Sequence, residues 1–177
     1  MTFWKLLWQK HKKISNIQKY NDNISEKIMI QDFNHKNQKI TIFLSKNKNI
    51  DLYELEQLCD TVGWVRRPLK KVKIALENSF LIVSLSYNHK KQKRLIAFAR
   101  ATSDNTFNAT IWDVVVHPEF QRQGLGKILI NEVIKQLRYS DIHTITLFAD
   151  PQVLNFYKNL GFISDPDGVK GMFWYPH

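Results

Sequence analysis

Residues 121–126 (QRQGLG), in the second half of the chain, have the composition of a phosphate-binding loop. Main-chain N–H groups at the start of a helix attract anions, because they lack partners and lie at the positive end of the helix dipole. Gly124 and Gly126 carry no Cβ atom that would keep a ligand away from that backbone. Arg122 and Lys127 add positive charge beside it. The run therefore suits a diphosphate held mainly by main-chain donors.

The same run could instead be a tight turn between a strand and a helix that binds no ligand. The glycines alone do not decide between these two interpretations. The run is not a Walker loop, since Gly-Lys-Ser/Thr is missing, and it is one glycine short of a dinucleotide fingerprint.

Two elements must position this loop. Residues 111–116 are apolar and mostly β-branched apart from Asp113, which favours a central strand. Pro118 ends that strand, because proline cannot donate to a sheet. After the loop, apolar residues recur at helical spacing, at Leu125, Ile128, Leu129, Val133, Ile134 and Leu137. The loop is therefore predicted to join a buried strand to an amphipathic helix.

The remaining pattern predicts an α/β sandwich in one domain. Strands are expected at residues 40–45, 80–87, 95–102, 106–116 and 144–149, and helices from Asp51 to about residue 63, at 68–78 and at 151–160. Short strands at residues 162–163 and 172–175 would complete the sheet. A chain of 177 residues is long enough to bury a substantial core.

Composition excludes several classes of protein. A hydrophobic content of 44% is typical of a soluble globular chain, and no apolar run is long enough to span a membrane. The single cysteine, Cys59, cannot form an internal disulfide and fits a reducing compartment. The six histidines show no ligand spacing with cysteine or carboxylates, so no metal is expected.

The net charge of +10 is concentrated at the N-terminus, where residues 1–50 hold ten lysines and three acidic residues. We interpret residues 1–38 as a basic extension and residues 39–177 as the folded domain. The extension could be a solvated arm, a helix docked on the domain, an amphipathic membrane-surface helix around Trp4 and Trp8, or an arm that binds polyanions without specificity.

The pattern Gln-x-x-Gly-x-Gly at residues 121–126, after a strand that ends VVVHP, resembles motif A of the GNAT superfamily, the acetyl-CoA-dependent N-acetyltransferases. Five further segments resemble its chloroplast and cyanobacterial branch, which includes plant plastid serotonin N-acetyltransferases and a reading frame of algal plastid genomes. They are ARATSD (99–104), FNATIWD (107–113), ITLFAD (145–150), FYKNLGF (156–162) and KGMFWYP (170–176). The resemblance implies a mixed, mostly antiparallel sheet with helices on both faces and its fourth and fifth strands splayed apart.

The resemblance also implies a function. The chain would use acetyl-CoA to acetylate a primary amine, either an arylalkylamine such as serotonin or tryptamine, or protein lysine, or both. It would work without a metal, in a plastid and plastid-encoded, or otherwise in the cytoplasm. A homodimer is left open, and no specific nucleic-acid partner is indicated. The alternative is a basic module that keeps the fold but binds nucleic acid or a membrane surface.

Cofactor-binding roles follow from the resemblance by position. The main chain of Val114, Val115 and Val116 would pair with the pantetheine arm of the cofactor. Asn155 would also touch the cofactor. The diphosphate would be held by the loop and helix start, namely Gln121, Arg122, Gln123, Gly124, Leu125, Gly126 and Lys127.

Two residues are candidates for the chemistry. Tyr157 is expected on the flank of the last helix, where its phenol could protonate a leaving thiolate; the alternative is an amphipathic tyrosine at the edge of the core. Asp150 could cap that helix before Pro151, or bind the substrate ammonium, or do both.

Some positions depart from the family pattern. Thr110 stands where many protein acetyltransferases carry a glutamate base, and strand alternation puts Asp113 on the opposite face from Thr110. His117 could shuttle a proton, although a histidine there is more often a strand end. An aromatic wall for an indole-ethylamine could come from Trp64, Phe107, Trp112 and Trp174.

Overall fold

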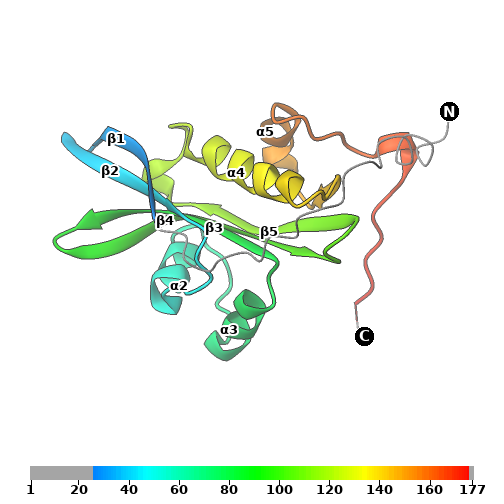
Figure 1. The fold of residues 1–177 in the computed structure, drawn as a ribbon, viewed down its shortest axis with the longest axis horizontal. Coiled ribbons are helices and arrows are strands. Elements are labelled where there is room, and N and C mark those ends of the chain that lie inside the picture. Colours follow the sequence, from blue (N-terminus) through cyan, green and yellow to red (C-terminus); the bar gives the residue numbers. More distant parts are fainter. Residues whose placement is uncertain (1–25, 176–177) are drawn as a thin grey trace.

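The computed structural model describes residues 26–175, which form a six-stranded sheet in the order β1-β2-β3-β4-β5-β6 (Figure 1). Neighbouring strands are antiparallel except for β5 and β6, which are parallel. The strands are β1 Lys27–His35, β2 Gln38–Ser45, β3 Leu81–His89, β4 Gln92–Ser103, β5 Asn108–Val116 and β6 Thr144–Leu147. The predicted mixed, mostly antiparallel sheet is therefore confirmed.

Helices cover both faces of the sheet, as predicted (Figure 1). α2 (Leu52–Thr61) and α3 (Leu69–Glu77) pack on one face, where Phe98 and Val115 join their apolar side chains in a buried cluster. α4 (Leu125–Tyr139) packs on the other, against small residues of β4. α5 (Leu154–Lys158) follows a single 3-10 turn, Pro151–Val153.

The start of α2 is fixed by its own sequence. The Asp51 carboxylate accepts hydrogen bonds from the main-chain N–H groups of Tyr53 and Glu54, at 2.9 and 3.2 Å. A side-chain acceptor at this position satisfies donors that have no partner within the helix. The predicted cap is therefore confirmed.

β1 was not predicted from the sequence. The strand predicted at residues 40–45 is β2, and the boundary proposed after residue 38 falls inside the β1–β2 hairpin. β1 shows no clean two-residue alternation, because its pairing with β2 shifts register twice and Asp32 has a left-handed backbone (φ 55°). The proposed helix around Trp4 and Trp8 lies outside the described residues.

The C-terminal strands were predicted wrongly. Neither residues 162–163 nor residues 172–175 form a strand, and Met172 and Trp174 are 95% and 82% exposed. Apolar, aromatic residues resemble a strand in sequence, but they form one only if they pair with another strand, and neither segment pairs with a described strand. Within residues 26–175, no helix combines the length and apolarity needed to cross a bilayer.

Candidate active site

A gap opens in the sheet between β5 and β6. Their parallel pairing starts with Asn108 opposite Thr144 and ends with Ile111 opposite Leu147, whereas β5 continues to Val116. Beyond Ile111, the edge of β5 that would face β6 therefore has no strand partner among residues 26–175. This is the splay that the resemblance implied for the predicted fourth and fifth strands.

A bulge in β5 sets which main-chain groups face this gap. Arg100 pairs with Trp112 and Phe98 with Val115, so β5 carries one residue more than β4, and Asp113 has a left-handed backbone (φ 53°). The N–H of His117 donates to a β4 carbonyl at 2.8 Å. Because main-chain groups alternate along a strand, Val115 faces β4, whereas Val114 and Val116 face the gap.

The start of α4, which follows the loop after β5, has no capping side chain. Arg122 and Gly124 have left-handed backbones (φ 57° and 83°), and Gly124 precedes the first turn of α4 without any capping side chain. The first intrahelical bond at this end runs from the Ile128 N–H to the Gly124 carbonyl, at 3.1 Å. The N–H groups of Leu125, Gly126 and Lys127 are thus left as donors, unlike those at the start of α2.

The two glycines differ in their surroundings. A Cβ on Gly124 would meet no atom within 4 Å, so the space in front of its backbone is open to a ligand. A Cβ on Gly126 would lie 3.4 Å from the Phe156 ring and 3.7 Å from Val116. Gly126 therefore also lets α4 approach α5 and β5 closely, which the sequence analysis did not predict.

The polar side chains of the loop divide into two groups. The Gln121 amide donates to the Val116 carbonyl at 2.9 Å, and the Gln123 amide donates to the Glu119 carbonyl at 2.8 Å, so both glutamines shape the loop. Arg122 and Lys127 are exposed and make no ion pair with the rest of residues 26–175. Their charges face solvent beside the main-chain N–H groups at the start of α4.

The Tyr157 ring is buried, with only 8% of the residue exposed, and makes edge contacts with Phe156 and Phe162. The predicted flank position was wrong, since Tyr157 is the buried residue of α5. The Tyr157 hydroxyl makes no hydrogen bond within the described part, where no buried side-chain polar atom lacks a partner. The hydroxyl therefore reaches solvent. Burial, followed by the nearby Asp150 carboxylate, raises the pKa of Tyr157 above 10.0.

Asp150 follows β6 and precedes Pro151 with an extended backbone, but its side chain makes no capping bond. The predicted side-chain cap is therefore not formed; only its carbonyl accepts, from the Val153 N–H at 3.0 Å. Its carboxylate is exposed and close enough to Tyr157 to raise that pKa. Asn155 lies exposed in α5.

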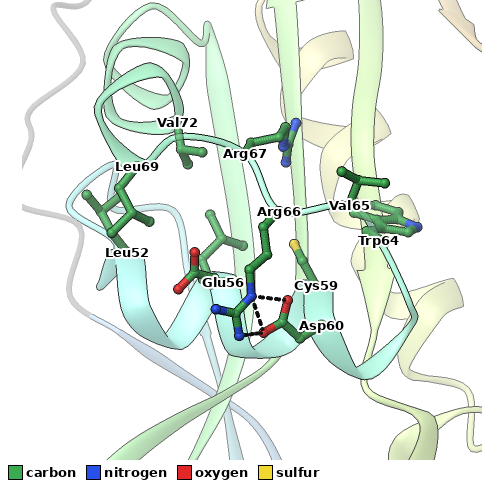
Figure 2. A pocket seen from close by; sticks show the side chains of 11 residues that line it. Leu52, Glu56, Cys59, Asp60, Trp64, Val65, Arg66, Arg67, Leu69 and Val72 are labelled. Atoms are coloured by element: carbon green, nitrogen blue, oxygen red, sulfur yellow. Dashed lines mark hydrogen bonds and ion pairs between the residues drawn. The ribbon is translucent and has the colours of Figure 1, made fainter.

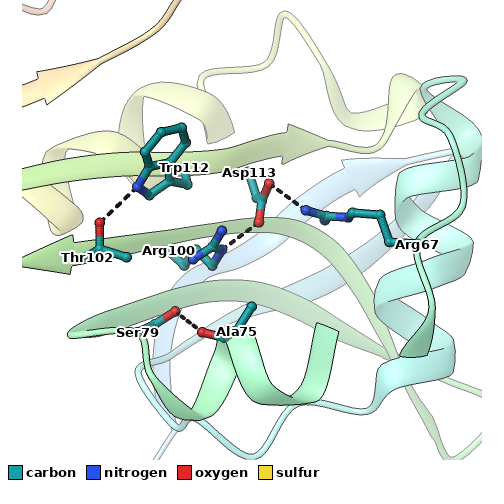
Figure 3. Close-up of polar contacts among 7 residues, drawn as sticks. All are labelled: Arg67, Ala75, Ser79, Arg100, Thr102, Trp112 and Asp113. Atoms are coloured by element: carbon teal, nitrogen blue, oxygen red, sulfur yellow. Dashed lines mark hydrogen bonds and ion pairs between the residues drawn. The ribbon is translucent and has the colours of Figure 1, made fainter. Parts of the chain in front are cut away.

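The bulge also moves Asp113. Its carboxylate accepts from Arg100 Nε at 2.5 Å and from Arg67 Nη1 at 3.1 Å, and Figure 3 shows it between the two. Arg100 lies opposite Trp112 in the register, so Asp113 shares their face. The predicted opposite face was wrong, because the extra residue breaks the alternation.

An aromatic wall, which we define as Trp112, Phe148 and Phe173, lies beside this ion pair. The Trp112 and Phe148 ring centroids are 5.5 Å apart, and those of Phe148 and Phe173 are 5.0 Å apart. The Trp112 indole donates to Thr102 at 2.9 Å (Figure 3). Phe148 and Phe173 were missed, whereas the predicted Trp64, Phe107 and Trp174 make no ring contact with described residues; they are 37%, 66% and 82% exposed.

Thr110 has no acidic partner that could replace the family's glutamate. Its hydroxyl lies 2.9 Å from the Thr146 hydroxyl on β6, at the closed end of the gap. Both hydroxyls are neutral. The acidic residue of β5 is Asp113, whose carboxylate already accepts hydrogen bonds from Arg67 and Arg100.

The loop between α2 and α3 is held at two points. Arg66 forms a forked ion pair with Asp60, and Figure 2 shows it at the mouth of a small pocket that Cys59 also lines. Arg67 reaches from the same loop to Asp113. Burial raises the pKa of Cys59.

A wider basin lies on the other side of β5, lined by His35, His89 and His117. His117 Nδ1 accepts from the Glu119 N–H at 3.2 Å, and burial lowers the pKa of His117. His117 thus packs at the strand end, away from the gap between β5 and β6. Among residues 26–175, no group of His, Cys, Asp and Glu could hold a metal ion.

Comparison with known proteins agrees with this geometry. The model of the acetyltransferase (GNAT) family matches residues 49–162, which include both splayed strands, the loop and α5. A GNAT-family acetyltransferase structure from Streptococcus pneumoniae superposes with a TM-score of 0.64 at 22% identity, covering 76% of this chain and 98% of that one.

Three relatives are closer in sequence. An uncharacterized N-acetyltransferase, ycf52, of Gracilaria tenuistipitata is 60% identical and covers 99% of both chains. A soybean histone acetyltransferase, TAP1, is 56% identical over 77% of this chain and 62% of its own length. The chloroplastic GCN5-related N-acetyltransferase 2 of Arabidopsis thaliana is 50% identical over 76% and 58%. This chain therefore belongs to the GNAT family and is an N-acetyltransferase.

Proposed function

We propose that this chain binds acetyl-CoA at residues 121–127 and in the gap between β5 and β6, and transfers the acetyl group to a primary amine. The observation that carries the proposal is the uncapped start of α4 behind a left-handed Gly124. Helix donors that no side chain caps form a site for phosphate. GNAT acetyltransferases use acetyl-CoA, and the residues present fit it.

Each part of the site would do a different job. Acetyl-CoA, when bound, supplies the acetyl group as an activated thioester. The N–H groups of Leu125, Gly126 and Lys127 would hold its diphosphate, and the Arg122 and Lys127 side chains would add charge. The main chain of Val114 and the N–H of Val116, whose carbonyl already accepts from Gln121, would align the pantetheine arm, with one N–H directed at the thioester carbonyl.

Proton transfer would fall to Tyr157 and Asp150. A phenol whose pKa is raised stays protonated at neutral pH, so Tyr157 Oη can donate to the thiolate that leaves. Asp150 keeps a carboxylate that is not used for capping, and it can bind the substrate ammonium or accept its proton through water. Thr110 offers no carboxylate for either role.

The acceptor is open between two classes. Similarity to a soybean histone acetyltransferase supports a protein lysine. The aromatic wall, whose members Trp112, Phe148 and Phe173 remain 37%, 55% and 61% exposed, supports an arylalkylamine such as serotonin or tryptamine. A plastid location is supported by the algal ycf52 and the chloroplastic Arabidopsis relatives. The alternative of a basic binding module is not favoured, because the family match spans the whole site.

Calorimetry followed by a thiol-release assay tests the proposal. We expect the purified protein to bind acetyl-CoA and to release CoA when a primary amine is added, with KM in the range of about 1 μM to 1 mM. Serotonin, tryptamine, lysine peptides and Nε-methylated versions of the same peptides should be compared, and the acetylated product identified by mass spectrometry. A folded protein that does not bind acetyl-CoA would refute the proposal.

A further inference from the structure

The β1–β2 hairpin lies before the segment that the family model matches, which begins at residue 49. Its tip nevertheless reaches the residues that lead into the phosphate loop. Lys36 and Asn37 both have left-handed backbones (φ 48° and 60°) and close the hairpin between His35 and Gln38 in a two-residue turn. The tight turn fixes where the Lys36 and His35 side chains point.

Phe120 is the first anchor between the hairpin and the loop. It ends the 3-10 turn Pro118–Phe120, immediately before Gln121, and only 2% of it is exposed. His35 stacks on its ring with centroids 4.2 Å apart and an interplanar angle of 15°. Phe33 stacks at 6.1 Å from the same hairpin. Residues of β1 thus cover the side chain of Phe120, which immediately precedes the phosphate loop.

Glu119 is the second anchor and joins the two parts directly. Its carboxylate lies 2.6 Å from Lys36 Nζ and 3.7 Å from His35 Nε2. The hydrogen bond from Lys36 lowers the pKa of Glu119. Its carbonyl oxygen accepts from the Gln123 amide at 2.8 Å, inside the phosphate loop. One residue therefore connects the hairpin tip to the centre of the loop.

This connection bears on ligand binding because the loop has an unusual backbone. Arg122 and Gly124 are both left-handed, and ordering such a loop only when the ligand arrives would subtract from the affinity. A loop already held at Glu119 and Phe120 presents its donors in advance. Neither Lys36 nor His35 needs to touch the ligand to have this effect.

We propose that the β1–β2 hairpin clamps the phosphate loop, and that Lys36 and His35 are positioning residues that raise the affinity for the cofactor. This inference rests on the acetyl-CoA site proposed above. It assigns a role to a strand that lies outside the segment matched by the family model. The Lys36 and Glu119 side chains are 66% and 45% exposed, so substitution should not unfold the protein.

Charge reversal tests the clamp. The calorimetric Kd for CoA should be measured for the wild type, Lys36→Glu, Glu119→Lys and the double variant. We expect each single variant to weaken binding by up to about fivefold, the range that an exposed ion pair can supply, and the double variant to recover most of the loss. Lys39→Glu is the matched control, because Lys39 is an exposed lysine of the same hairpin without an ion pair to described residues. Lys39→Glu changes the net charge by the same amount as Lys36→Glu.

Hydrogen exchange of the cofactor-free protein gives a readout that does not depend on activity. Amides of residues 119–127 should exchange faster in Lys36→Glu than in Lys39→Glu, because only the first loses the clamp. Equal Kd values and equal exchange for these two variants, with wild-type CoA binding intact, would overturn the clamp alone. A wild type that binds no CoA would overturn the cofactor site and the clamp with it.

Discussion

The two parts of β5 serve sites that are assembled in different ways. At its C-terminal end, β5 runs directly into the phosphate loop and α4, so the main-chain donors come from one stretch, residues 114–127. In its middle, Asp113 and Trp112 meet side chains from three other segments, including Arg67 before α3 and Phe148 after β6. We call these the cofactor end and the acceptor side, after the roles proposed above for acetyl-CoA and for the amine.

This difference predicts which substitutions each site tolerates. The cofactor end relies on main-chain groups, so it is sensitive to backbone conformation and tolerant of most side-chain changes. The acceptor side relies on ion pairs and ring contacts between distant segments, so loss of one partner leaves another without its bond. The two should therefore fail separately when each is mutated.

The largest effect is expected at Tyr157. Tyr157→Phe keeps the buried ring but removes the hydroxyl, so kcat should fall about 100-fold or more, the usual contribution of a general acid. The Kd for acetyl-CoA should change less than about twofold, since the ring packing is kept. Because burial raises the pKa of Tyr157, the wild type should retain its acid form to a higher pH than a free tyrosine would. Unchanged turnover would remove the assignment.

A smaller effect, confined to the cofactor end, is expected for Gly124→Val. A β-branched residue at φ 83° is strained by about 1–3 kcal/mol, and its side chain would occupy the space now open in front of the loop. The calorimetric Kd for acetyl-CoA should rise at least about tenfold, or 1.4 kcal/mol. Gly63→Val is the matched control: Gly63 is also left-handed (φ 76°) with open space around it, but it follows α2. Equal losses of binding in both variants would contradict a phosphate loop.

The smallest effect is expected at the acceptor side, for Asp113→Asn. Two arginines, of which Arg100 is only 14% exposed, would lose their anion, so unfolding free energy should fall by about 1–3 kcal/mol. We also expect KM for the amine to rise severalfold while the Kd for acetyl-CoA is unchanged, because the Arg67 loop is released. Asp60→Asn, which breaks the exposed pair with Arg66, should cost less than about 1 kcal/mol in the same thermal unfolding measurement. Weakened acetyl-CoA binding in Asp113→Asn would show that the two sites are not separable.

Much of the fold could be predicted from local patterns. The Asp51 cap, the strand that leads to His117 and the glycine-bearing turn each depend on residues that are neighbours along the chain. The splay was not visible in any pattern and came from the resemblance. The structure shows where the splay begins: the pairing between β5 and β6 stops at Ile111, while β5 continues.

Other features were hidden because they depend on partner strands. No local signal marks the bulge at Asp113, since an extra residue is defined only by the register with β4. The burial of Tyr157 depends on how α5 packs against the core, which helical spacing alone does not give. β1 was not predicted, because its two register shifts obscure the two-residue alternation on which strand prediction relies.

The sequence by itself determined the cofactor end, because a helix start, its glycines and the preceding strand are contiguous and their physics is local. Only the tertiary structure decided the acceptor side, where Arg67, Arg100 and Asp113 meet from three separate segments. It also decided that the β1–β2 hairpin reaches Glu119. Contacts between distant segments depend on how the sheet is assembled, and no single stretch of sequence carries that information.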